Sequence, residues 1–204
     1  MKTPKAHGGD GNLAISTAHS FFALAGTFFE TIPDDLNARA KFLIEHRGML
    51  IAATTNLVFA VELLLKGVAL KTLGRAYEGH RLIERFDELP LDVRESIESC
   101  YRYRIDQDAG QKFPAVELGV SPVEVDSSVM ARAHRLNRPA GEDVRSLLES
   151  EKDAFQLWRY FYEQADPRRP VCATIHWYRL GVLVNAIQDQ FVPPHERPNF
   201  PRPS

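Results

Sequence analysis

The sequence predicts an all-α protein, an up-and-down helical bundle with a long loop insertion. Apolar residues recur at helical spacing along most of the chain, and prolines and glycines separate these periodic segments. Residues 110–141 are the exception, because they sustain no helical stripe. A chain of 204 residues is long enough for one full core, which we assign to a single domain over residues 12–192.

The first predicted helix has an apolar face over residues 13–32 and ends at Pro33, which cannot continue a helix. A second helix is expected over residues 36–73. Asp34 and Asp35 supply its N-cap and suit the positive end of its dipole, and Gly48 offers a place for a kink. The two longest apolar segments of the first half are therefore predicted to be neighbouring helices.

Shorter helices follow in the middle of the chain. Gly74 is a suitable C-terminal stop, residues 80–89 form a short helix, and Pro90 separates it from another that starts near Asp92. Residues 110–141 contain three prolines and short β-favouring runs, so we predict an insertion or long surface loop there.

The last third of the chain returns to helical periodicity. A strong stripe of large apolar side chains covers residues 144–162, and a turn with two prolines precedes a last helix over residues 171–191. Residues 193–204 contain five prolines and are expected to form an extended tail. Residues 1–11 are polar and glycine-rich, and we expect them to be disordered.

Composition limits the class of protein. The formal net charge of −2 excludes a globally basic nucleic-acid binder but allows a local basic patch. Cys100 and Cys172 are far apart and have no CxxC spacing, so neither a disulfide framework nor a zinc site is expected. The most membrane-like segment, residues 49–70, contains Glu62 and Lys66, whose charges oppose membrane insertion. We therefore expect a soluble, cytoplasmic protein without membrane contact.

Two predicted helices, residues 36–73 and 171–191, are apolar on opposite sides. A helix of this kind is either central in its bundle or also faces a partner subunit. The pattern therefore allows a homodimer, and burial within one bundle explains it equally well.

Short motifs on this helical framework are similar to those of a known superfamily. Residues 61–66 read Val-Glu-Leu-Leu-Leu-Lys, residues 79–82 read Gly-His-Arg-Leu, and residues 158–160 read Trp-Arg-Tyr before the apolar last helix. In these features the chain resembles the HEPN superfamily, small helical domains of prokaryotic defence and toxin proteins. Arg81 stands where the family usually has an acidic residue.

The resemblance implies a possible activity. Active HEPN members are metal-independent ribonucleases with an arginine a few residues before a histidine, completed across a dimer, and these side chains suit base catalysis and phosphorane stabilisation. Of three such spacings in this chain, Arg169 to His176 lies at the start of the last helix, where the family's catalytic pair sits. The alternative is a partly buried His176 and a solvated Arg169.

Two further groups of residues are candidates for binding. Glu62, Lys66, His80 and Arg159 are expected either to line a groove as one polar cluster or to form structural ion pairs. Arg132, Arg135 and Arg138 form a basic run in the insertion, suited to phosphate contacts or to a solvated face. No metal-binding motif is present, and no cofactor is expected.

Two functions follow as hypotheses. One is a HEPN-like protein acting on RNA, as a metal-independent endoribonuclease toxin of a defence or toxin–antitoxin system, in which Arg169 and His176 act across a homodimer and an antitoxin is a partner. The alternative is a non-catalytic HEPN-like module that binds RNA, a nucleotide or a partner protein.

Overall fold

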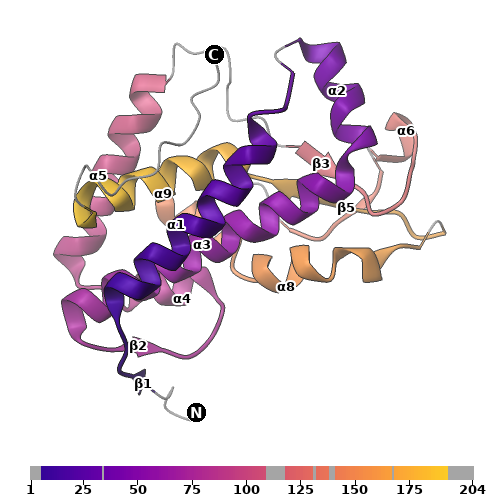
Figure 1. Ribbon diagram of the computed structural model, residues 1–204. Helices are drawn as coiled ribbons and strands as arrows, with labels where there is room; N and C mark the ends of the chain where they lie inside the picture. Colours follow the sequence, from indigo (N-terminus) through magenta and orange to yellow (C-terminus); the bar gives the residue numbers. More distant parts are fainter. Residues whose placement is uncertain are drawn as a thin grey trace.

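The structure is a computed structural model, and it describes residues 6–33, 35–108, 118–130, 132–137, 141–166 and 168–192. This part of the chain is mainly helical, as the sequence predicts (Figure 1). In chain order the helices are α1 (Gly11–Phe29), α2 (Leu36–Glu45), α3 (Arg47–Leu73), α4 (Leu82–Asp87), α5 (Leu91–Asp108), α6 (Ser127–Met130), α7 (Val144–Ser150), α8 (Ala154–Arg159), the 3-10 helix η1 (Phe161–Gln164) and α9 (Trp177–Phe191).

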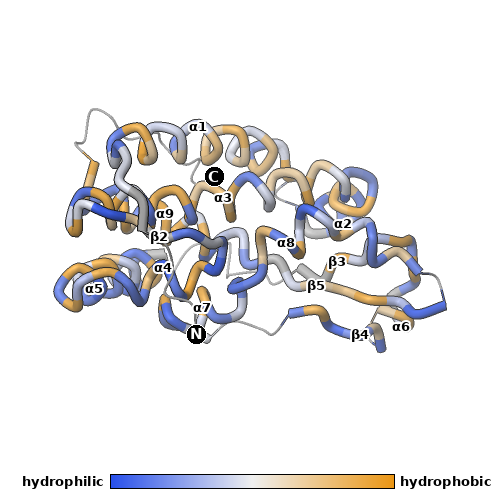
Figure 2. The backbone as a smooth tube through the Cα atoms, turned by 90° about the horizontal axis from the view of Figure 1, so that it is seen from below, coloured by the Kyte–Doolittle hydropathy of each residue, from blue (hydrophilic) through white to orange (hydrophobic). Residues whose placement is uncertain are grey.

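The strands form two small sheets. In the first, β1 (Ala6–His7) pairs antiparallel with β2 (Ala76–Tyr77). In the second, β5 (Val171–Ile175) is central, with β3 (Leu118–Val120) antiparallel on one side and β4 (His134–Arg135) parallel on the other. Figures 1 and 2 place α5 at one end of an elongated molecule and β4 with α6 at the other.

The central element is α3, which packs against α1, α4, α8 and α9. Figure 2 shows it between α1 and the layer that contains α4. Its side chains are buried on several sides, including Leu57, Val61 and Leu65. Burial inside the bundle therefore accounts for the doubly apolar pattern of α3, and α9 is buried in the same way.

By length and composition alone α3 is apolar enough to cross a membrane. In the structure, 56% of its most apolar window is buried within the chain. Glu62 and Lys66 pair with each other in this helix, which lowers the cost of placing them in a core. Burial to this extent agrees with a core helix, a kind of helix that meets the same criteria of length and composition as a membrane span.

Several helices begin or end at the capping residues that the sequence predicts. The Asp35 side chain accepts a hydrogen bond from the N–H of Ala38, as an N-cap should. Gly74 ends α3 in the left-handed region, with φ +67°. The chain breaks between α2 and α3 at His46, close to the expected kink. Within α3, a Cβ on Gly67 would lie 2.7 Å from the Ile15 side chain, so glycine permits the close approach of α1.

The last helix is shorter than predicted. Residues 171–175, expected to be its first turns, form β5 instead, and α9 starts at Trp177. Val171, Thr174 and Ile175 are β-branched, and both flanking strands come from the predicted insertion. Pairing with distant segments therefore outweighs the helical periodicity of this stretch.

The remaining differences lie at the termini and in the stripe over residues 144–162. That stripe is divided into α7, α8 and η1. Residues 6–11, expected to be disordered, form β1 and the start of α1, whose N-cap is Asp10. The proline-rich tail over residues 193–204 lies outside the described residues.

Candidate functional site

Three members of the predicted polar cluster meet at α3. The Glu62 side chain is 1% exposed, and the Lys66 ammonium donates to its Oε1 at 2.7 Å. Nδ1 of His80, from the loop before α4, lies 3.0 Å and 3.1 Å from the two carboxylate oxygens. A buried carboxylate is stable only with such partners, so the three side chains tie the β2–α4 loop to the core helix.

The fourth member, Arg159, joins the cluster through an aromatic ring. The His80 ring stacks on Phe155 of α8 with centroids 4.9 Å apart and an interplanar angle of 18°. The Arg159 Cζ atom lies 5.7 Å from the Phe155 centroid and 5.2 Å from that of Tyr160. His80, Phe155, Arg159 and Tyr160 thus form a row of planar groups, which we call the planar ladder.

Ion pairs surround this cluster. Arg81 contacts both Glu84 and Asp153, and the hydrogen bond to Glu84, with the charge of Asp153, raises the pKa of its guanidinium. The buried Arg85 contacts Glu88, whose carboxyl pKa is raised by burial against the opposing effect of Arg85. The Arg81–Asp153 pair joins α4 to the α7–α8 turn and the other pairs lie within α4 and its caps, and we assign all of them a structural role.

Two hollows border the planar ladder. A cleft of about 330 Å³ is lined by His80, Phe155 and the α7–α8 turn. A larger groove of about 1140 Å³ extends along α8 and is lined by Tyr160 and, from the insertion, Asn137. Lys152, Asp153 and Gln156 line both hollows, so the cleft and the groove share a wall.

Arg169 and His176, the predicted catalytic pair, are kept apart by β5. Arg169 precedes this strand and His176 follows it, and an extended chain of that length spans about 23 Å. The His176 side chain is 0% exposed, and its Nδ1 contacts the buried Glu151 carboxylate. Within one chain the two side chains therefore lie too far apart to act on one phosphate, and their action across a homodimer stays a prediction.

Arg169 instead lies beside the predicted phosphate-binding residues. The backbone N–H of His134 donates to the carbonyl of Pro170, and Arg135 is in register with Cys172. The turn before β5 exposes Arg168 and Arg169, next to exposed β4. This group, which we call the arginine patch, comprises Arg132, Arg135, Arg168 and Arg169. Arg138 lies outside the described residues.

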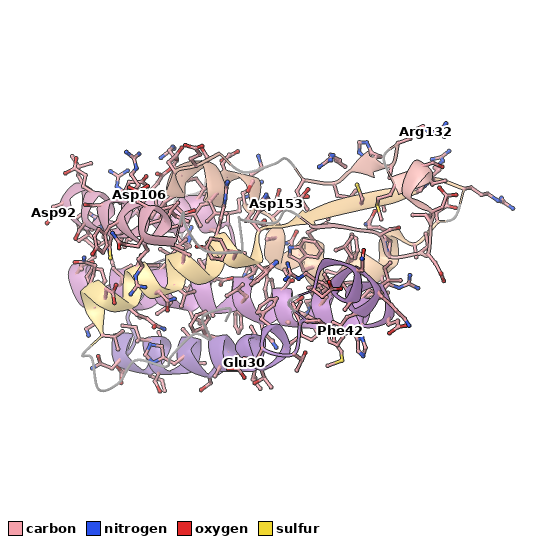
Figure 3. All side chains as sticks on the ribbon, turned by 90° about the horizontal axis from the view of Figure 1, so that it is seen from above. Glu30, Phe42, Asp92, Asp106, Arg132 and Asp153 are labelled. Carbon is pink, nitrogen blue, oxygen red and sulfur yellow. The ribbon has the colours of Figure 1, made fainter. Side chains whose placement is uncertain are left out.

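The arginine patch differs electrostatically from the bundle. Six bundle arginines each lie within ion-pair distance of a carboxylate: Arg81, Arg85, Arg94, Arg102, Arg104 and Arg145. Among the described residues, no carboxylate forms such a pair with a member of the patch. Figure 3 shows Arg132 at one extremity, with Asp92 and Asp106 towards the other.

Two acidic residues in neighbouring turns, Asp126 and Asp166, accept hydrogen bonds from backbone N–H groups rather than pairing with the patch arginines. Asp126 accepts hydrogen bonds from the hydroxyl and N–H of Ser128 and the N–H of Val129, and these bonds lower its carboxyl pKa. Asp166 accepts from the N–H of Arg168. Each carboxylate thus shapes a turn. Arg132 donates to the Ser128 carbonyl and Arg135 to the Thr174 hydroxyl, and because both acceptors are neutral, these bonds leave the arginine charges uncompensated.

Sequence reasoning missed two residues of these sites. Phe155 carries the planar ladder, although its place in an apolar stripe predicts only packing. Glu151 partners His176, and its position beside a periodic apolar segment gives no sign of burial. Among the described side chains, no three His, Cys, Asp or Glu residues converge as a metal site.

Comparisons with known proteins found no match to this chain. No family model matches it, and neither a curated protein nor a solved structure does. The HEPN resemblance therefore rests on the residues quoted above and stays a prediction.

Proposed function

We propose that this chain is a HEPN-like, cytoplasmic helical protein that binds RNA through the arginine patch without cleaving it. The observation that carries the proposal is the exposed group of arginines that has no ion-pair partner among the described residues. Arginines beside carboxylates are largely neutralised within the fold, whereas those of the patch retain their charge. The guanidinium group is well suited to bidentate contact with phosphate.

The small sheet gives the patch a defined shape. The patch residues come from β4, from the turn before β5 and from the turn after α6, and the β4–β5 register places the backbone of Arg135 beside Cys172, with its guanidinium donating to the Thr174 hydroxyl. Phosphate contacts of this kind position a nucleic acid without reading its sequence. A local patch of this type also reconciles RNA binding with the chain's slightly negative net charge.

The enclosure of His176 favours the non-catalytic hypothesis over the ribonuclease. A general base has to reach the 2′-hydroxyl of the substrate, and a side chain with 0% exposure offers no such access. Because the His176 side chain contacts Glu151, we assign His176 a structural role in the core. The homodimer expected for an active member stays a prediction.

The test is binding of a fluorescein-labelled single-stranded RNA of about 12 nucleotides, measured by anisotropy over a range of salt concentrations. Arg168→Ala/Arg169→Ala is expected to weaken binding roughly tenfold at low salt. The slope of log K against log salt should fall in magnitude by about 1.4, because two phosphate contacts are lost.

The matched control is Arg102→Ala/Arg104→Ala, which removes two arginines that are paired with Glu98 and Asp189 on the bundle. We expect this control to bind RNA as the parent protein does. Equal losses in both double variants, or no binding of any RNA by the parent protein, would overturn the proposal. The RNA should also remain intact during these measurements, and release of 2′,3′-cyclic phosphate ends would contradict the non-catalytic part.

A further inference from the structure

The planar ladder borders both the cleft and the groove through different members. His80 and Phe155 line the cleft, Tyr160 lines the groove, and Gln156 lines both. Successive members of the ladder are in contact through rings and the guanidinium plane. The row therefore runs from the cleft, at His80 and Phe155, to the groove, at Tyr160.

Several of these planar groups are accessible. The His80 side chain is 52% exposed, Tyr160 is 40% exposed, and Arg159 is exposed as well. Tyr162, in η1, is 68% exposed. An exposed tyrosine of this kind offers stacking surface at a low entropic cost, because the contact with Arg159 already orients Tyr160.

The ladder is close enough to the arginine patch for one short strand to contact both. From Tyr160 the chain continues through η1 to Arg168, a path of at most about 22 Å. The groove that Tyr160 lines is also lined by Leu136 and Asn137, which directly follow Arg135 in the sequence. The groove thus extends from Tyr160 to residues that adjoin the arginine patch in sequence.

We infer that the ligand of this surface is single-stranded RNA, with a base stacked on Tyr160 and phosphates on the arginine patch. The inference rests on the proposed function and specifies its substrate. A base of a single strand exposes both faces for stacking, whereas duplex bases are covered by their neighbours. The combination of aromatic faces and a cationic track is the arrangement that single strands recognise without sequence preference.

The test compares Tyr160→Ala with Tyr103→Ala, a matched control because Tyr103 is 65% exposed on α5 and does not line the groove. The probes are a single-stranded RNA that contains 2-aminopurine and a hairpin duplex of the same length. We expect the parent protein to quench the 2-aminopurine and to bind the single strand at least tenfold more tightly than the duplex. Tyr160→Ala should weaken single-strand binding roughly tenfold and abolish the quenching.

Two further readouts separate this inference from the proposed function. Tyr160→Ala should leave the salt slope unchanged, because tyrosine carries no charge, and Tyr160→Phe should restore both affinity and quenching. If RNA binding depends on the arginine patch but the affinities for single strand and duplex are equal, this inference alone would be overturned. Equal effects of Tyr160→Ala and Tyr103→Ala would do the same. Absence of any RNA binding by the parent protein overturns the proposed function and this inference together.

Discussion

The helical bundle and the small-sheet end of this molecule use charged residues in opposite ways. In the bundle, the carboxylates of Glu62 and Glu151 are each 1% exposed and contact basic side chains. Arginines there also lie beside carboxylates. At the sheet end, the exposed arginines of the patch have no such partner among the described residues.

This difference indicates which charged residues stabilise the fold and which remain available to bind a ligand. A buried charge contributes to folding only through its partners, so its removal leaves an orphaned group in a medium of low dielectric. An exposed arginine without a partner contributes little to folding and remains available to an external anion. Substitutions in the bundle should therefore lower the free energy of unfolding, whereas substitutions in the arginine patch should lower RNA affinity. The following predictions test that difference, from the largest expected effect to the smallest.

His176→Ala should have the largest effect on stability. It leaves the Glu151 carboxylate buried without its basic partner, and Oε2 of that carboxylate already has no hydrogen-bond partner. We expect the free energy of unfolding to fall by about 3–5 kcal/mol, measured by urea denaturation. His134→Ala, at an exposed position in β4, is the control and should change it by less than about 0.5 kcal/mol. A loss below about 1 kcal/mol for His176→Ala would contradict a structural role.

Glu62→Gln should have an intermediate effect. Glutamine keeps the shape of the side chain but loses the charge that accepts bonds from Lys66 and His80. A decrease of about 2 kcal/mol in the free energy of unfolding is expected. Glu45→Gln is the matched control, because Glu45 pairs with Lys41 at the same helical spacing but is 54% exposed. Its effect should stay below about 0.5 kcal/mol, and similar losses at both sites would mean that burial does not set the strength of the Glu62 pair.

The bundle was predictable from sequence because its signals are local. Apolar periodicity indicates α1, α3 and α5, and caps such as Asp35 and Gly74 are local residue choices. Glu62 and Lys66 share one helix, so their spacing alone predicts the contact that the structure contains. Helices of this kind depend little on residues far away in the chain.

The sheet end was not predictable in the same way. Whether residues 171–175 form a strand depends on β3 and β4, which lie far from them in sequence. The same strand sets Arg169 and His176 apart, although their spacing resembles that of a catalytic pair. Arg132 and Arg135 could be identified as a basic run, but their proximity to Arg169 follows only from the β4–β5 register. Non-local pairing therefore decides which of the candidate residues share a site.

Arg168→Ala/Arg169→Ala should have the smallest effect on folding. Both side chains are exposed in the turn before β5, and the described hydrogen bonds of that turn use the backbone N–H groups of these residues, which alanine retains. We therefore expect the free energy of unfolding to change by less than about 0.5 kcal/mol in urea denaturation. A loss above about 1 kcal/mol would mean that these guanidinium groups have a partner within the folded chain, and such a partner would compete with phosphate. Unchanged stability in the same variant that loses RNA affinity would instead establish that the sheet end carries charge for a ligand and not for the fold.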